Sequence, residues 1–132
     1  MSAKPVVIVI SDLHLGGGGA DKGDDHVFDQ QQLAGFIDTL RTSGDGQQGR
    51  IELYINGDFL EFAQVGQNLY TLRSADAWCS EGESRAKLKL ILDGHPEVFA
   101  ALKAFSAAGN RVTLAAGNHD VDLFWEGVQA DL

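Results

Sequence analysis

Residues 6 to 14 read Val-Val-Ile-Val-Ile-Ser-Asp-Leu-His, a β-branched apolar run that leads directly into an acid and a histidine. The apolar part, Val6–Ile10, predicts a strand that is buried on both faces, as in a parallel sheet placed between helices. Two comparable runs occupy residues 51–55 and 111–116, and each ends at a turn that contains glycine. We therefore expect three buried strands whose carboxyl ends lead into polar loops.

Helical patterns lie between these strands. Apolar residues recur at the spacing of one helix face in residues 33–40, 88–92 and 98–105, and a further set follows in residues 121–128. Gly44, Gly94 and Gly109 are the expected helix ends or interruptions, and Pro96 is expected at a first helical position. The order of elements predicts an α/β fold with parallel strands joined by βαβ crossovers.

Composition limits the classes of function. The 132 residues carry 19 acidic and 10 basic side chains, for a net charge of -9, which disfavours unaided binding of nucleic acid or of an anionic membrane. The run at residues 6–10 is far shorter than the roughly 20 residues of a membrane span. A single cysteine, Cys79, excludes an internal disulfide and favours a reducing, cytoplasmic location.

Two segments show no clear helix or strand pattern. The glycine run at residues 16–19, with the acidic stretch that follows it to residue 29, is expected to be a mobile loop. The segment from residue 63 to residue 83 holds Trp78 and Cys79, for which packing is the expected role. We expect His26 and His95 to be solvated or to cap helices.

The first polar loop places Asp12 and His14 two residues apart. Alternation in an extended segment would point both side chains the same way, and an Asp oxygen with a His nitrogen suits Zn, Fe or Mn. Taken alone, this pair is better explained as a polar loop with a helix cap.

The second and third strands end in comparable groups. Residues 57–61 read Gly-Asp-Phe-Leu-Glu, and residues 117–120 read Gly-Asn-His-Asp. Each is explained separately by a glycine turn with a capping side chain. Together, however, they would place several carboxylates at one edge of the sheet, which costs several kcal/mol unless a cation is bound. Asp58, on the middle strand, is best placed to bridge two ions.

These motifs resemble those of a known family. Asp12-X-His14, Gly57-Asp58-X-X-Glu61 and Gly117-Asn118-His119-Asp120 are similar, in order and placement, to the first three motifs of the calcineurin-like metallophosphoesterases. The resemblance spans nearly the whole chain. It implies that residues 1–132 are the N-terminal half of an α/β/β/α sandwich domain that is incomplete at its C-terminus.

The resemblance also implies roles for six residues. The first metal ion would be bound by Asp12 and His14, both ions would be bridged by Asp58, and the second would be bound by Asn118. His119 would act near the leaving group, oriented by Glu61. The implied cofactors are two divalent ions, with Mn expected and Fe, Zn, Ni or Mg as alternatives. The implied reaction is attack of a metal-bound hydroxide on the phosphorus of a phosphomonoester, phosphodiester or pyrophosphate.

The chain also departs from the family pattern. An isolated histidine and a Gly-His-X-His motif, which supply the family's remaining ligands, are absent from the sequence. We therefore expect a missing half or a partner chain to complete the site. The stretches at residues 11–16 and 57–61 are similar to the UDP-2,3-diacylglucosamine hydrolase branch, although that branch commonly has arginine where this chain has His119. The alternative function is a non-catalytic binding scaffold or an inactive fragment.

Overall fold

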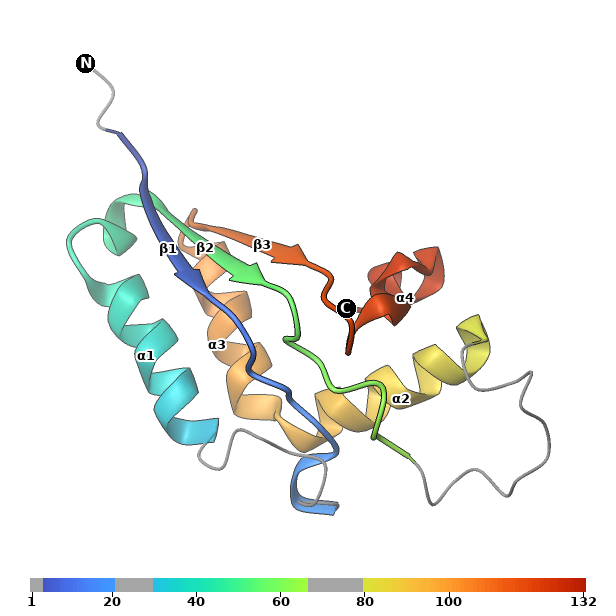
Figure 1. The fold of residues 1–132 in the computed structure, drawn as a ribbon. Coiled ribbons are helices and arrows are strands. Elements are labelled where there is room, and N and C mark those ends of the chain that lie inside the picture. Colours follow the sequence, from blue (N-terminus) through green and yellow to red (C-terminus); the bar gives the residue numbers. More distant parts are fainter. Residues whose placement is uncertain (1–3, 21–29, 67–79) are drawn as a thin grey trace.

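The computed structural model describes residues 4–20, 30–66 and 80–132, and in these residues strands and helices alternate (Figure 1). The strands are β1 (Val6–Ile10), β2 (Ile51–Asn56) and β3 (Arg111–Ala115), and the helices are α1 (Gln30–Thr42), α2 (Glu81–Gly94), α3 (Pro96–Ala107) and α4 (Glu126–Asp131). Short 3-10 segments occur at η1 (Gly18–Ala20), η3 (Gly46–Gln48) and η5 (Val121–Phe124). No described helix is both long and apolar enough to cross a membrane.

The described strands form one parallel sheet in the order β1-β2-β3. Val6 pairs with Ile51, and Glu52 pairs with Arg111, so the strands start and finish nearly level with one another. The α/β class with parallel strands is therefore confirmed. Because the strands run the same way, the three loops that follow them leave the sheet at the same edge.

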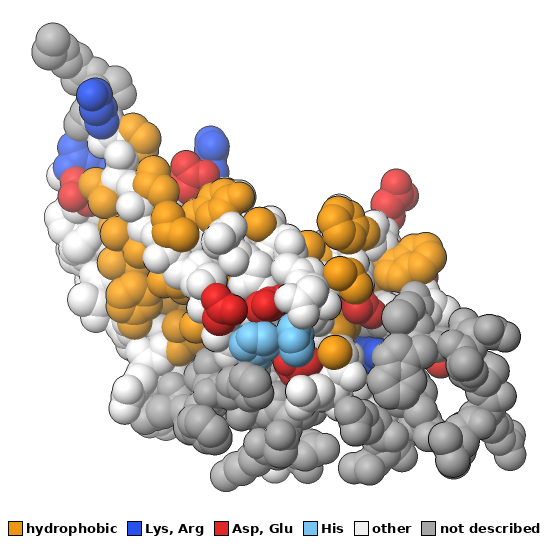
Figure 2. All heavy atoms as spheres, in the orientation of Figure 1, with side chains coloured by type: hydrophobic (Ala, Val, Ile, Leu, Met, Phe, Trp, Pro, Cys, Tyr) orange, Lys and Arg blue, Asp and Glu red, His pale blue; other side chains and the backbone are white. Residues whose placement is uncertain are grey.

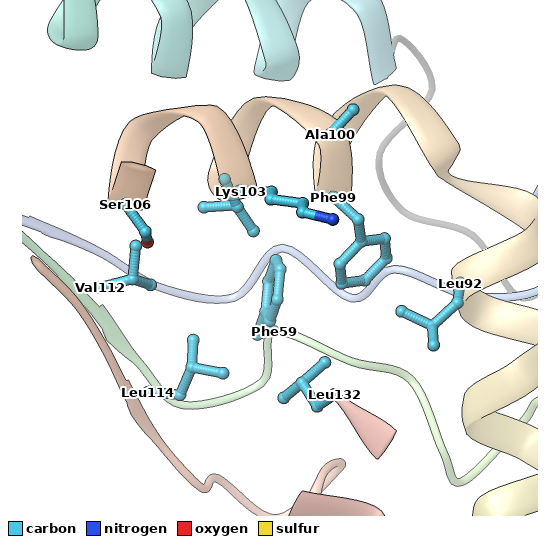
Figure 3. Close-up of a pocket in the computed structure, with 10 residues that line it drawn as sticks. Phe59, Leu92, Phe99, Ala100, Lys103, Ser106, Val112, Leu114 and Leu132 are labelled. Atoms are coloured by element: carbon cyan, nitrogen blue, oxygen red, sulfur yellow. The ribbon is translucent and has the colours of Figure 1, made fainter. Parts of the chain in front are cut away.

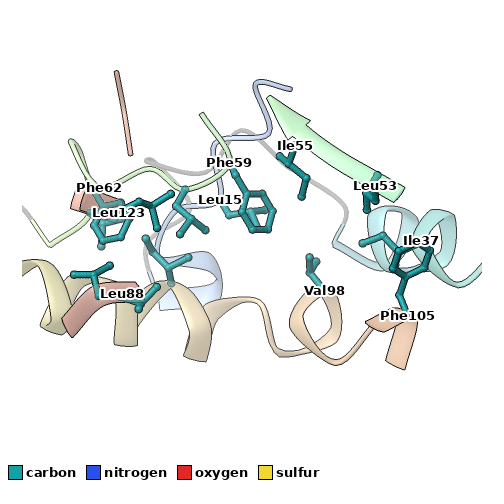
Figure 4. Close-up of a cluster of buried hydrophobic side chains, with 14 of the residues drawn as sticks. Leu15, Ile37, Leu53, Ile55, Phe59, Phe62, Leu88, Val98, Phe105 and Leu123 are labelled. Atoms are coloured by element: carbon teal, nitrogen blue, oxygen red, sulfur yellow. The ribbon is translucent and has the colours of Figure 1, made fainter. Parts of the chain in front are cut away.

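One face of the sheet is covered by α1 and α3 (Figure 1). Leu53 and Ile55 of β2 point toward these helices and are at most 1% exposed, and they share the core with Ile37, Val98 and Phe105 (Figure 4). Complete burial of each such side chain stabilises the fold by about 1.5–3 kcal/mol. The helices that the apolar spacing predicted between the strands are confirmed, and they form this core.

The prediction that β1 is buried on both faces is wrong. Val7 and Val9 point away from the helices and are 54% and 61% exposed. β-branched residues suit any pleated strand that is half buried, so a continuous apolar run does not distinguish one covered face from two. Within the described residues, the covering helices α1 and α3 lie on the face toward which Val6, Ile8 and Ile10 point.

Helices α2 and α3 meet at His95. Ser80 caps α2 by accepting a hydrogen bond from the N–H of Glu83, and Pro96 begins α3 as predicted. Gly94 ends α2 and does not interrupt it. His95 is 1% exposed, so its expected solvated role is wrong, while its backbone does occupy the capping position of α3.

The glycine run packs tightly against the end of α2. Gly18 has a φ of +64°, and a Cβ atom there would lie 2.5 Å from the carbonyl oxygen of Gly94. Gly16 and Gly18 are both buried, so part of the glycine run packs against the fold, and its mobility stays a prediction. Residues 21–29, which include His26, and residues 67–79, which include Trp78 and Cys79, lie outside the described residues.

The helix expected over residues 121–128 is divided in two. Trp125 has extended backbone angles and separates η5 from α4. Phe124 and Trp125 are 78% and 43% exposed, whereas Leu123 and Val128 pack in the core. The apolar spacing therefore predicted the burial of Leu123 and Val128 but not the exposure of Val121 and Phe124, nor the break at Trp125.

Candidate metal centre

The loops that follow β1 and β2 stay paired beyond the strands. The N–H of His14 donates to the carbonyl of Asp58 at 2.9 Å, and the N–H of Glu61 donates to the carbonyl of Leu15 at 2.9 Å. Leu15 and Leu60 form an isolated parallel bridge, and both are completely buried. This continued pairing fixes the two loops relative to each other, so polar side chains on them are held by the backbone.

Three residues of these loops have a left-handed backbone. Asp12, His14 and Asp58 have φ values of 56°, 47° and 51°, and they are the non-glycine residues with positive φ in the described parts of the chain. Such a conformation costs about 1–2 kcal/mol per residue for an L-amino acid. Strained backbone of this kind clusters at functional sites, and all three residues are predicted metal ligands.

The left-handed conformation also corrects one step of the sequence reasoning. Asp12 and His14 were expected to point the same way because an extended segment alternates, but the backbone at both positions is not extended. Their side chains nevertheless converge with that of Asp58, and one ligand atom from each lies within 4.8 Å of the others. The backbone turns, and not strand alternation, bring these groups together.

The group of Asp12, His14 and Asp58 fits a divalent cation. Its donors are two carboxylates and one imidazole, a set suited to Mn, Fe or Zn. Asp12 is exposed, and His14 and Asp58 are partly exposed, so the group opens to solvent at the surface. Figure 2 shows two imidazoles beside several carboxylates on the surface near the carboxyl ends of the strands.

The buried side chain of Glu61 contacts two histidines, His14 and His119. Its carboxylate is completely buried and lies 2.9 Å from Nδ1 of His14 and 2.7 Å from Nδ1 of His119. The two rings meet edge to face, with centroids 4.6 Å apart. Because an ionised carboxylate only accepts hydrogen bonds, each Nδ1 is the protonated donor, and Nε2 is the ring nitrogen that could bind a metal ion or a substrate.

Glu61, His14 and His119 also have ligand atoms within 4.8 Å of one another, but the distances between these atoms disfavour metal binding. Two ligands bonded at 2.0–2.1 Å to a tetrahedral ion lie about 3.3 Å apart. The separations of 2.7 and 2.9 Å are instead those of charge-assisted hydrogen bonds. The buried carboxylate of Glu61 therefore orients the two rings, and Asp12, His14 and Asp58 form the group better suited to hold an ion.

His119 lies at the edge of the site with 28% of its side chain exposed. The hydrogen bond that His119 donates to Glu61 raises the pKa of His119, burial opposes this effect, and the charges of Glu61, Asp58 and Asp120 add to the increase. In the metal-free protein, protonation of the His119 ring is therefore more favourable than protonation of a free histidine. A histidine in this state can donate a proton near neutral pH.

The third loop lies against Asp58. The N–H of His119 donates to Oδ1 of Asp58 at 2.9 Å, and a Cβ atom at Gly117 would lie 2.7 Å from the backbone nitrogen of Asp58. Glycine is therefore required at position 117 by this close approach. Asn118 lies between Gly117 and His119 in the sequence, and it is exposed. The structure thus places the predicted site residues on three adjoining loops.

Asp120 has a role that the sequence reasoning did not assign. Its completely buried carboxylate accepts hydrogen bonds from the N–H groups of Phe59 at 2.8 Å and of Gly117 at 2.5 Å, with longer ones from Asp58 and Leu60. The sequence grouped Asp120 with the third polar loop, but an acid that ligates and an acid that holds backbone look alike in a sequence.

An apolar cavity of about 610 Å³ lies away from these groups, between α3 and β3 (Figure 3). Among the described residues, its lining is mostly apolar, with Lys103 and Ser106 as its polar members. Phe59 connects the cavity to the site, because its ring lines the cavity while its backbone N–H is bonded to Asp120. The polar chemistry therefore belongs to the loop cluster and not to this cavity.

Comparison with known proteins adds no relative: the chain matches no family model, no curated protein and no solved structure.

Proposed function

We propose that the protein is a metal-dependent phosphoester hydrolase of the calcineurin-like metallophosphoesterase type. The observation that carries this proposal is the convergence of Asp12, His14 and Asp58 within 4.8 Å on strained loop backbone. Close by, Glu61 hydrogen-bonds Nδ1 of His119 at 2.7 Å. Acidic ligands beside an oriented histidine suit the transfer of a phosphoryl group to water.

The ligand roles follow from the geometry and from the family resemblance. Asp12, His14 and Asp58 would hold one ion, and Asp58 with Asn118 would hold the second. When bound, divalent ions such as Mn²⁺ neutralise phosphate charge and acidify coordinated water. A chain with a net charge of -9 could then accept an anionic substrate. Further ligands would come from water or from another polypeptide segment.

The protein's own groups account for the proton and for orientation. Glu61 fixes the His119 ring through Nδ1, so Nε2 is the nitrogen that would face a leaving-group oxygen. In the metal-free protein, the hydrogen bond to Glu61 raises the pKa of His119 and so favours its protonated form. His14 would be oriented by the same carboxylate, because metal-binding histidines commonly donate their second N–H to an acid.

The substrate class is proposed only as far as the phosphoester. Phosphomonoesters, phosphodiesters and pyrophosphates share the group that such a site would bind. The resemblance to the UDP-2,3-diacylglucosamine hydrolase branch adds a pyrophosphate as a specific substrate to test. We also propose a cytoplasmic location, because the only cysteine, Cys79, leaves no internal disulfide to form.

The test is hydrolysis of bis(p-nitrophenyl) phosphate with and without added Mn²⁺. Wild-type protein is expected to turn over the ester only with the metal, and Asp58→Asn is expected to lower the rate at least about 100-fold. Asp38→Asn, a change of an exposed acid on α1 that pairs with Arg41, is the matched control and should keep the rate. Equal, negligible rates in wild type and Asp58→Asn would overturn the proposal and favour a binding scaffold.

A further inference from the structure

Asp120 is a buried acid whose partners are backbone N–H groups of two site loops. Oδ1 accepts from Gly117 in its own loop at 2.5 Å and from Asp58 at 3.3 Å, and Oδ2 accepts from Phe59 at 2.8 Å and from Leu60 at 3.3 Å. Its side chain is completely buried. A carboxylate held by several N–H groups is strongly satisfied without a cation, so this acid is suited to hold backbone and does not need a metal ion.

The geometry of the second loop explains why these N–H groups converge. Gly57 and Asp58 both have left-handed backbone, with φ values of 82° and 51°. Successive N–H groups in such turns point into one concavity that binds an anion. Asp120 supplies that anion from within the chain, and the interaction favours a conformation that Asp58 would otherwise avoid.

A second contact runs in the opposite direction. Asp58 Oδ1 accepts from the N–H of His119 at 2.9 Å, while Asp120 accepts from the N–H of Asp58. Each loop therefore gives a carboxylate to the backbone of the other. The backbone and the carboxylate of Asp58 are both fixed by residues of the third loop, next to Asp12 and His14.

We infer that Asp120 is the positioning residue of the metal centre: its carboxylate holds Asp58 in the left-handed conformation that aims the Asp58 side chain at the ion. This inference rests on the proposed function, because it assigns Asp58 a metal ion to bind. Asp120 itself would touch neither the ion nor the substrate. Its substitution should therefore weaken metal binding by misplacing Asp58.

The test compares Asp120→Asn with Asp122→Asn. Asparagine keeps the size of the side chain but replaces one acceptor oxygen with an NH₂ group, which would face two backbone N–H groups. Asp122 is the matched control: it is also buried, at 6% exposure, but its carboxylate accepts from the Ser84 hydroxyl on α2 and not from the backbone of a site loop. Binding of Mn²⁺ is measured from the spin-resonance signal of the free ion, and the folded fraction from circular dichroism.

Asp120→Asn is expected to lower the affinity of folded protein for Mn²⁺ by about 10–100-fold. Asp122→Asn should leave that affinity within about twofold of wild type, because it shares no partner with the site. In metal-free protein, amide hydrogen exchange at Phe59 should become faster in Asp120→Asn and stay unchanged in Asp122→Asn. If Asp120→Asn does not fold, Asp120→Glu takes its place, since the added methylene displaces the carboxylate while the charge is kept.

The outcomes separate the two proposals. Wild-type affinity in the Asp120 variant, or an equal loss in both variants, overturns the positioning role and leaves the hydrolase proposal intact. If wild-type protein binds no Mn²⁺ up to millimolar concentration, the hydrolase proposal fails, and the positioning role fails with it. A selective loss in the Asp120 variant, with faster exchange at Phe59, supports the positioning role.

Discussion

Each end of the sheet is held together by a buried polar side chain of its own, and the two side chains differ in kind. At the amino ends of the strands, Asn110 accepts from the N–H of Ile51 at 3.0 Å and donates to the carbonyls of Gly46 and Phe105. At the carboxyl ends, Asp120 only accepts. A neutral amide thus closes one end, and an anion closes the other.

The backbone differs in the same way. At the amino end, the left-handed positions are Gly49 and Gly109, which adopt positive φ without strain. At the carboxyl end, Asp12, His14 and Asp58 adopt it despite their side chains. This contrast indicates that the amino end is arranged for stability, whereas the carboxyl end accepts strain in order to gather acids and imidazoles.

The largest expected effect follows from replacing Glu61 with glutamine. The neutral amide of glutamine has no charge and one acceptor oxygen, so the charge-assisted hydrogen bonds that orient His14 and His119 should both weaken. We expect Mn²⁺-dependent hydrolysis to fall by about 10²–10⁴-fold. The control is Glu52→Gln, a change of a partly buried acid that accepts from the Thr113 hydroxyl on the sheet. Similar rates in the two variants would contradict the orienting role.

The second effect tests the amino end. Asn110→Ala removes three hydrogen bonds in a buried position and should lower the free energy of unfolding by about 3 kcal/mol. Urea denaturation measures this change. The affinity of the remaining folded protein for Mn²⁺ should not change, because the amino end lies at the other end of the strands. A loss of affinity at equal folded fraction would show that the two ends are not independent.

A smaller effect tests the strain itself. Asp12→Gly should raise the unfolding free energy of metal-free protein by about 0.5–1 kcal/mol, because the relief of left-handed strain exceeds the added chain entropy of glycine. Gly49→Ala should do the opposite at the amino end, where a Cβ atom would lie 3.0 Å from the Gly109 carbonyl oxygen. Urea denaturation of both variants gives the answer. Destabilisation by Asp12→Gly would mean that Asp12 is not strained.

The smallest effect concerns pH. The hydrogen bond that His119 donates to Glu61 raises the pKa of His119 in the folded protein above its ordinary value of 6.5. The contribution of the His119–Glu61 hydrogen bond to the free energy of unfolding is therefore full below pH 6.5 and is lost as the pH rises through the raised pKa. Titration of metal-free protein by NMR should show the raised value, and Glu61→Gln should lower it. An unchanged pKa in that variant would exclude Glu61 as the cause.

Much of the fold followed from local patterns. The runs at residues 6–10, 51–55 and 111–116 predicted the strands, and helical spacing predicted α1, α2 and α3, because periodicity reports which side chains must be buried together. The burial of β1 on only one face did not follow, since Val7 and Val9 have the residue type of a core strand. Likewise, Gly18 reads as flexible in a sequence and is fixed only by its contact with Gly94.

The sequence by itself determined which residue types stand at the ends of the strands, because the position of a loop after a strand is a matter of chain order. It placed Asp12, His14, Asp58 and Asn118 there, together with Glu61 and His119. Only the tertiary structure decided how these groups are divided into a set whose ligand atoms converge, a buried carboxylate shared by two rings, and an acid that holds backbone. Those roles depend on left-handed turns and on hydrogen bonds between residues about 60 positions apart, such as that from Phe59 to Asp120. Spacing along one chain does not encode such contacts, because they form only when the parallel sheet brings its three loops to one edge.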